Sequence, residues 1–187
     1  LIWLSIRNRR LQADAERERA RLAAVVADVP GIVWEAWGKP DAANQRIDFV
    51  SDHVEPMLGY SVEEWLRTPN FWLSIVHPDD RERAGADAAA IFASGESGAN
   101  QFRWVARDGR VLDVLAISSV IRDENGAPAG MRGVTLDISE RRRAEEALTF
   151  TAKASEVLFA PLGEANVLQD IAKLIVPALA DWCTIYL

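Results

Sequence analysis

Three side chains that could bind a metal ion or transfer a proton lie within four positions of one another in SIVHPDDRERA, residues 74–84. They are His77, Asp79 and Asp80, and the chain has only two histidines. A metal site needs three or four converging ligands, and this segment offers at most three on one tight turn. The alternatives are an acid–base pair and the start of a helix.

The helix interpretation accounts for every residue of this segment. Pro78 suits the first helical position, where its missing N–H costs no hydrogen bond. Asp79 and Asp80 then fall in the first turn, where negative charge interacts favourably with the helix dipole. We therefore predict that His77 lies at or beside the N-cap and hydrogen-bonds to the turn. We assign no metal ligand and no catalytic residue.

Composition narrows the classes of function. The 187 residues are 49% hydrophobic and carry a net charge of −7, which argues against a broad basic surface for nucleic acid. The single cysteine, Cys183, excludes an internal disulfide framework and a multi-cysteine zinc site. The sequence has no phosphate-binding glycine loop with Lys, no Gly-x-Ser-x-Gly elbow and no phosphoacceptor histidine helix, so we do not expect this segment to be an enzyme.

The first residues, LIWLSIRNRR, combine six residues of low polarity with Arg7, Arg9 and Arg10. Six residues cannot span a bilayer, which takes about 20. Residues 1–6 fit the last turns of a transmembrane helix with the arginines on the cytoplasmic side, or an ordinary helix start. The first interpretation predicts a cytoplasmic segment of a protein anchored in the inner membrane through residues before position 1.

Residues 7–29 predict a long helix, because they are rich in good helix formers and contain no Gly or Pro. A mixed heptad pattern indicates either a weak parallel coiled coil or a solvated amphipathic linker. Its two positions are occupied by Leu4, Leu11, Glu18 and Val25 and by Asn8, Ala15, Leu22 and Val29.

Residues 30–138 predict a small α+β domain. IVWEAWG (32–38) and RIDFVSD (46–52) are typical of short strands, and four short helical segments follow them. Ser61 and Glu64 match a capping box at the start of one of these helices.

After Gly98 the sequence predicts three strands joined by hairpins at Asp108-Gly109 and Asn125-Gly126, in which both turn residues supply positive φ. A two-residue turn would place Arg107 opposite Arg110. It would also place Phe102 opposite Leu115, Trp104 opposite Asp113, Arg103 opposite Val114 and Val105 opposite Leu112.

The order of these elements resembles that of a PAS domain. FVSDHVEPMLGYSVEEWL, FWLSIVHPDDRERA and FRWVARDGRVLDVLAISSVIRDENGAPAGMRGVTLDISERRRAEEAL resemble successive parts of the family pattern. The resemblance implies a five-stranded antiparallel sheet with short helices on one face, flanked by coiled-coil-like signalling helices. Residues 161–187, which include VPALADWC, resemble the beginning of a GAF domain.

LDIS, followed by Glu140, resembles the family's Asp-Ile-Thr junction, with Ser139 in place of Thr. Asp137 and Ser139 are good N-cap residues for an exit helix over residues 139–160. The resemblance implies that Asp137, Ser139 and Arg141 transmit a signal from the sheet to this helix. A plain helix cap is the alternative.

The resemblance leaves the cofactor unknown. Cys183 lies outside the PAS region, and His53 and His77 do not lie on the long helix, so we expect neither covalent flavin photochemistry nor haem. A non-covalent flavin, a small metabolite or no ligand remain open. For each aromatic residue the alternative to lining a pocket is an ordinary place in the core. The candidates to line a pocket are Trp34, Trp37, Phe49, Met57, Trp65, Trp72, Phe102, Arg103, Trp104 and Leu115.

These features predict a sensory PAS segment that forms a parallel homodimer through its flanking helices and precedes GAF and output domains. The resemblance points to a sensor histidine kinase of a two-component system as the parent. Serine phosphatases and cyclic-di-GMP enzymes share the PAS–GAF order. The competing hypothesis is a dimerisation and relay module with a filled core and no ligand.

Overall fold

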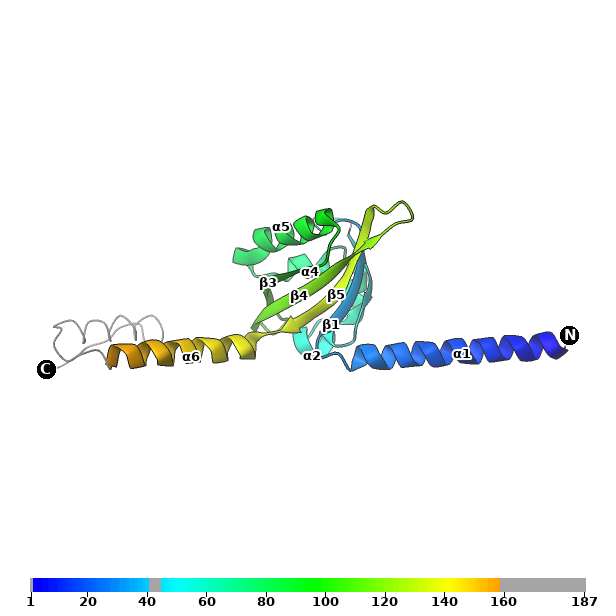
Figure 1. The fold of residues 1–187 in the computed structure, drawn as a ribbon, viewed down its shortest axis with the longest axis horizontal. Helices are drawn as coiled ribbons and strands as arrows, with labels where there is room; N and C mark the ends of the chain where they lie inside the picture. Colours follow the sequence, from blue (N-terminus) through cyan, green and yellow to red (C-terminus); the bar gives the residue numbers. More distant parts are fainter. Residues whose placement is uncertain (1, 41–44, 159–187) are drawn as a thin grey trace. The chain divides into compact units, whose positions relative to one another are not determined.

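Five segments rich in β-branched and aromatic residues form one antiparallel sheet. The strands are β1 (Ile32–Trp37), β2 (Arg46–Val50), β3 (Gly98–Val105), β4 (Val111–Arg122) and β5 (Pro128–Asp137). Their spatial order is β2-β1-β5-β4-β3, so the first and last strands are neighbours. This arrangement is drawn in Figure 1, from a computed structural model that describes residues 2–40 and 45–158.

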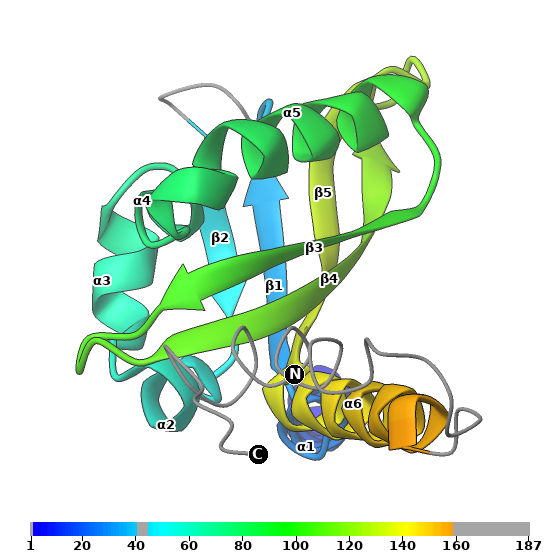
Figure 2. The ribbon, with the colours of Figure 1, turned by 90° about the vertical axis from the view of Figure 1, so that its left-hand side faces the viewer.

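Four helices between β2 and β3 pack on one face of the sheet, as Figure 2 shows. They are α2 (Val54–Leu58), α3 (Val62–Arg67), α4 (Phe71–Ser74) and α5 (Pro78–Ser94). The main core lies between these helices and the inner face of the sheet. The predicted fold class, a five-stranded antiparallel sheet with short helices on one face, is confirmed.

Helix α3 begins with the predicted capping box. The backbone N–H of Glu64 donates to Ser61 Oγ at 3.3 Å, and the N–H of Ser61 donates to Glu64 Oε2 at 2.9 Å. These two bonds satisfy backbone donors that the start of a helix leaves unpaired. They therefore stabilise the first turn of α3, which is only six residues long.

The predicted β3–β4 register is wrong by one residue. The hairpin has a three-residue loop, because the N–H of Ala106 donates to the carbonyl of Arg110 at 2.8 Å. Gly109 has φ 87°, whereas Asp108 does not adopt positive φ. A type I turn followed by one left-handed residue gives this three-residue loop, and Gly is favoured at its last position.

The observed register pairs Phe102 with Val114 and Trp104 with Leu112, and all four side chains are buried. A shift of one residue moves every side chain of a strand to the other face of the sheet. At these two rungs the inner face of the hairpin is therefore apolar, while Arg103 lies on the other face of β3.

The β4–β5 hairpin also has a three-residue loop. The N–H of Asp123 donates to the carbonyl of Ala127 at 2.9 Å, and the N–H of Gly126 donates to Asp123 at 3.0 Å. Gly126 has φ 80°, and Asn125 does not have positive φ, contrary to the prediction for this turn.

Two long helices flank the sheet in the sequence. Helix α1 spans Ile2–Ala27, and helix α6 spans Ser139–Leu158. The chain divides into two units after Ile138, so that α6 belongs to the second. The predicted GAF segment, residues 161–187, lies outside the described residues. Within the described part, no helix combines the length and apolarity that a membrane crossing requires.

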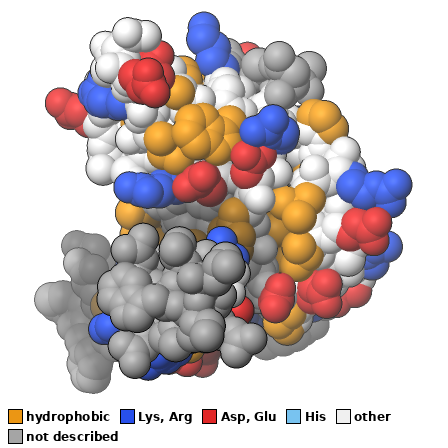
Figure 3. All heavy atoms as spheres, turned by 90° about the vertical axis from the view of Figure 1, so that its right-hand side faces the viewer, with side chains coloured by type: hydrophobic (Ala, Val, Ile, Leu, Met, Phe, Trp, Pro, Cys, Tyr) orange, Lys and Arg blue, Asp and Glu red, His pale blue; other side chains and the backbone are white. Residues whose placement is uncertain are grey.

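Some apolar side chains remain exposed on the surface of the first unit. Phe49, Val111 and Ile117 are 43%, 50% and 42% exposed. Figure 3 shows that hydrophobic side chains on one face are interspersed with acidic and basic ones. Scattered apolar residues of this kind are normal on a folded surface, and we assign no site to them.

Candidate ligand-binding cavity

A cavity of about 50 Å³ lies in the first unit between the sheet and helices α3 to α5. Its lining residues come from all five strands, from those three helices and from the positions next to residues 41–44. They are Trp34, Ala36, Pro40, Gln45, Ile47, Trp65, Trp72, Ala88, Asn100, Phe102, Trp104, Ala116, Ser118, Met131 and Thr135.

Small side chains leave this space among large ones. Ala36, Ala88 and Ala116 come from β1, α5 and β4, and all three are buried. Around them, the aromatic rings contact one another: Trp72 and Phe102 have centroids 5.8 Å apart, and Phe102 and Trp104 have centroids 5.6 Å apart. The space between the rigid aromatic rings stays unfilled, because each alanine side chain ends at its Cβ.

Two hydrogen bonds hold tryptophans of the cavity wall. The indole N–H of Trp72 donates to Gln45 Oε1 at 2.9 Å, and that of Trp34 donates to Thr135 Oγ1 at 3.0 Å. Gln45 is 2% exposed and Thr135 is 1% exposed. Each polar residue therefore fixes the position of one ring in the wall.

Other polar groups of the wall have no partner in the part of the chain that the structure describes. Gln45 uses only its amide oxygen, so its Nε2 is left without an acceptor there. The indole N–H of Trp65, a residue that is 2% exposed, also lacks an acceptor among the described residues. A buried donor without an acceptor costs roughly 1–3 kcal/mol. The Trp65 N–H is enclosed by protein, whereas the Gln45 amide nitrogen can donate to a polar group bound in the cavity.

Five of the predicted pocket residues line this cavity, namely Trp34, Trp65, Trp72, Phe102 and Trp104. Arg103 and Leu115 lie outside it because they alternate along β3 and β4 with inward-facing residues. Phe49 is exposed, Met57 packs from α2 against the main core, and Trp37 lies against Gly130 on β5.

Sequence reasoning missed the polar part of the wall, which consists of Gln45, Asn100, Ser118 and Thr135. A polar residue at an inward position of a strand is the signal that could have identified the last three. For Ser118 that signal depends on the β3–β4 register, which was predicted one residue off, whereas Asn100 has the same parity along β3 as Phe102 and Trp104.

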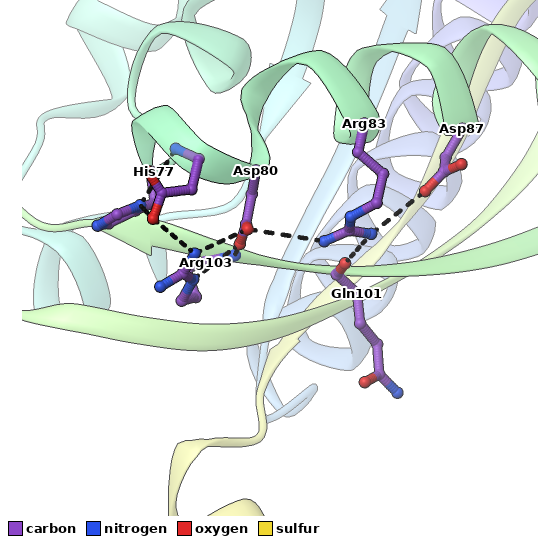
Figure 4. A network of polar contacts seen from close by, with 7 residues as sticks. His77, Asp80, Arg83, Asp87, Gln101 and Arg103 are labelled. Atoms are coloured by element: carbon purple, nitrogen blue, oxygen red, sulfur yellow. Dashed lines mark hydrogen bonds and ion pairs between the residues drawn. The ribbon is translucent and has the colours of Figure 1, made fainter.

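The SIVHPDDRERA segment forms a separate polar corner at the start of α5, drawn in Figure 4. Pro78 is the first residue of the helix and His77 is its N-cap. The N–H of Asp79 donates to His77 Nδ1 at 3.4 Å, which confirms the predicted cap. His53 precedes α2, and neither imidazole lines the cavity.

Asp80 joins this corner to β3. Its carboxylate accepts hydrogen bonds from the backbone N–H, Nε and Nη2 of Arg103 at 2.9, 2.9 and 2.8 Å. The Arg103 guanidinium lowers the pKa of Asp80 to about 2, and Asp80 in turn raises the pKa of Arg103. The Asp80 side chain is 13% exposed and that of Arg103 is 34% exposed, so the carboxylate is the better shielded partner of the pair.

The corner also covers part of strand β3. The N–H of His77 donates to the carbonyl of Arg103, and the N–H of Val105 donates to that of Ile75, both at 2.8 Å. Arg83 donates to the carbonyl of Gln101 at 2.9 Å. The groups that first suggested chemistry are thus engaged in joining α5 to the sheet.

The three predicted signal-transmission residues lie around the end of β5. Asp137 is its last residue and pairs with Val114 in the β4–β5 ladder. Ser139 is the first residue of α6, and Arg141 forms an ion pair with Glu145 at 3.4 Å on the same helix. The ladder continues to Ile138, whose N–H donates to the carbonyl of Asp113 at 2.9 Å.

Residues 47–135 match the family model of the PAS fold. A stretch of 101 residues is 31% identical to the methyl sulfide methyltransferase-associated sensor of Methanosarcina acetivorans, covering 54% of this chain and 10% of that protein. The chain therefore corresponds to only a small part of that relative.

Two solved structures share the fold. The N-terminal domain of a diguanylate cyclase with PAS/PAC sensor from Marinobacter aquaeolei has a TM-score of 0.53 and 22% identity, covering 60% of this chain and 98% of that one. A sensory box histidine kinase/response regulator from Burkholderia thailandensis has a TM-score of 0.54 and 21% identity, covering 71% and 96%.

Proposed function

Because residues 47–135 match the PAS fold, we propose that the chain is the sensory segment of a larger signalling protein and detects a small ligand in its cavity. The observation that carries this proposal is the amide nitrogen of Gln45, a cavity-lining residue that is 2% exposed, because this nitrogen donates to no acceptor among the described residues. A core whose only task is stability gains nothing from such groups, whereas a bound molecule satisfies them.

The sheet offers a direct route from the cavity to the exit helix. Ala116 and Thr135 both line the cavity and pair with each other in the β4–β5 ladder. The same ladder extends to Asp137, two residues before α6 begins. A ligand that displaces these strands would change the start of α6, with Asp137, Ser139 and Arg141 as the transmitting residues.

We place the signal output in a part of the parent protein outside this chain. A parallel homodimer through the flanking helices would bring two exit helices together, and their shift would bias the output domains. A sensor histidine kinase in the cytoplasm, with or without a membrane anchor, is the parent we favour. The sensory box histidine kinase of Burkholderia thailandensis supports this choice, while the diguanylate cyclase of Marinobacter aquaeolei supports a cyclic-di-GMP enzyme as the alternative.

A relay module without a ligand is the second candidate function. The observation that favours it is the small size of the cavity, about 50 Å³, inside a core that five aromatic rings largely fill. In this alternative, the cavity holds only water and the domain transmits movement between its flanking helices.

Ligand extraction separates the two candidates. The full-length parent protein, purified without denaturation, is expected to release a stoichiometric small molecule that mass spectrometry detects. Protein that releases none, and whose cavity holds only water in a crystal structure, would support the relay module instead.

The transmission step has its own test in the full-length parent. Asp137→Ala is expected to abolish the response of the output to ligand while circular dichroism shows a folded domain. The matched control is Asp52→Ala, because Asp52 is an exposed carboxylate far along the chain from β5. An Asp137→Ala protein that fails to fold would make Asp137 a structural residue only.

A further inference from the structure

We propose that the cavity ligand is a small uncharged molecule, smaller than a benzene ring, that presents a hydrogen-bond acceptor such as a carbonyl oxygen. This inference rests on the proposed ligand-sensing function and specifies the chemical class of the ligand. Three properties of the cavity wall lead to it: its charge, its unpaired donors and its volume.

The wall carries no charge among the residues that the structure describes. The one charged residue of β3, Arg103, is bound to Asp80 outside the cavity. An ion transferred into a largely apolar space loses its hydration, and here no described side chain would supply a counter-charge. The wall therefore selects against carboxylates, phosphates and ammonium groups.

The wall has more donors than acceptors available to a ligand. The oxygen of the Gln45 amide is occupied by Trp72, which leaves the NH₂ group. The Asn100 side-chain amide, which makes no hydrogen bond in the described part of the chain, adds a second NH₂ group and one oxygen. The Ser118 hydroxyl, which is buried, makes no hydrogen bond there either and can donate or accept. A ligand that supplies an acceptor can therefore hydrogen-bond to donors of the cavity wall that otherwise have only water as a partner.

The volume limits the size of the ligand. A cavity of about 50 Å³ exceeds the roughly 10–15 Å³ that one buried water needs. It is smaller than the roughly 150 Å³ of a cavity that binds benzene. The space therefore accommodates a molecule of a few non-hydrogen atoms without rearrangement of the tryptophans.

Acetamide and acetate provide a matched pair of probes, because they have nearly the same size and shape and differ in charge at pH 7. Both are titrated into the full chain at up to tens of millimolar, because they are probes of the ligand class and neither is offered as the natural ligand. Two-dimensional NMR of the tryptophan indole N–H groups is the readout. We expect acetamide to shift the signals of Trp65 and Trp72 to saturation, and acetate to bind at least tenfold more weakly.

Ala116→Val tests whether the probe occupies the cavity. The added methyl groups take up space at a buried lining position, in a strand where Val is favoured. Ala99→Val on β3 is the matched control, because Ala99 is exposed and does not line the cavity. We expect Ala116→Val to weaken acetamide binding at least tenfold and Ala99→Val to leave it unchanged.

Gln45→Glu is a second variant in case Ala116→Val does not fold. A carboxylate can still accept from Trp72, but it cannot donate as the amide does. Acetamide binding is therefore expected to fall at least tenfold. Equal binding of acetate and acetamide, or acetamide binding that both variants leave unchanged, would overturn the proposed ligand class.

The molecule extracted from the full-length parent distinguishes failure of this inference from failure of the proposed function. A charged or larger compound bound in the cavity would overturn the ligand class and leave the sensory function intact. If no compound is recovered and neither probe shifts the indole signals, both proposals are overturned.

Discussion

The corner at the start of α5 and the cavity beneath helices α3 to α5 differ in the hydrogen bonding of their polar groups. In the corner, Asp80 accepts three hydrogen bonds from Arg103, and the His77 ring accepts one from the turn. In the cavity, the Gln45 amide nitrogen and the Asn100 side-chain amide have no partner among the described residues. The satisfied charges of the corner favour a structural role, whereas the unsatisfied donors support the ligand site that we propose for the cavity.

The two regions meet on strand β3, where Trp104 faces the cavity and the neighbouring Arg103 faces the corner. A residue type that is common in active sites is thus no guide to function on its own. The state of its hydrogen bonds is the more useful property, and it becomes visible only in three dimensions. Four measurements would sharpen or break this contrast.

Trp104→Ala should have the largest effect, because it removes a ring that is 2% exposed and contacts Trp65 and Phe102. We expect the free energy of unfolding to fall by about 3–5 kcal/mol, measured by urea denaturation. Val111→Thr on β4 is the control, since Val111 is 50% exposed and Thr keeps the branched shape; it should change stability by less than about 0.5 kcal/mol. An equally small effect of Trp104→Ala would show that the cavity wall does not support the core.

Asp80→Asn should lower the free energy of unfolding at pH 7 by about 2 kcal/mol, because it removes a carboxylate that is only 13% exposed and leaves Arg103 without its main partner. Asp87→Asn on the same helix is the matched control: Asp87 is 45% exposed, and its ion pair in the described part of the chain is with Arg83 at 3.4 Å. Exposed pairs of this kind contribute about 0–1 kcal/mol. Similar losses in the two variants would contradict a structural role specific to Asp80.

The free energy of unfolding should also depend on pH through the ion pair of Asp80 with Arg103. The pKa of Asp80 is about 2 in the folded protein, below its value of about 3.9 in an unfolded chain. The stabilisation is therefore fully present above about pH 5 and is lost as the pH falls towards 2, by on the order of 2 kcal/mol. Urea denaturation across this range should show a shallower decline in Asp80→Asn than in the wild type, and parallel curves would refute the assignment.

Ser118→Ala should have the smallest effect, although Ser118 is 5% exposed. Its hydroxyl makes no hydrogen bond within the described part of the chain, so its removal should change stability by less than about 0.5 kcal/mol or even stabilise. A loss above about 1 kcal/mol would mean that the hydroxyl already has a partner, such as an ordered water. The contrast between the cavity and the corner would then disappear at this position.

The sequence alone predicted the sheet, the short helices and the His77 cap, since strand patterns and cap residues are local signals. It did not predict the β3–β4 register, because an Asp-Gly pair is compatible with both two-residue and three-residue loops. In the predicted register Trp104 faced Asp113, and in the observed one it faces Leu112 across the inner side of the sheet.

The pairing of Asp80 with Arg103 was beyond sequence reasoning for a different reason. The two residues are 23 positions apart and belong to different elements, so no periodicity connects them. The Gln45–Trp72 bond joins residues 27 positions apart, between a connecting segment and a four-residue helix. Such contacts depend on the angle between helices and sheet, which local sequence does not determine.

The adjacency of β1 and β5 has a mechanical consequence. The strands are antiparallel, and the rung between Ile32 and Thr135 lies where β1 begins and β5 ends. Tension applied through the two ends of the domain would load this rung first, so the strands would peel apart one hydrogen-bonded pair at a time instead of shearing together. Thr135 also holds the indole of Trp34 in the cavity wall, and pulling on the domain would therefore act on the cavity at its first step.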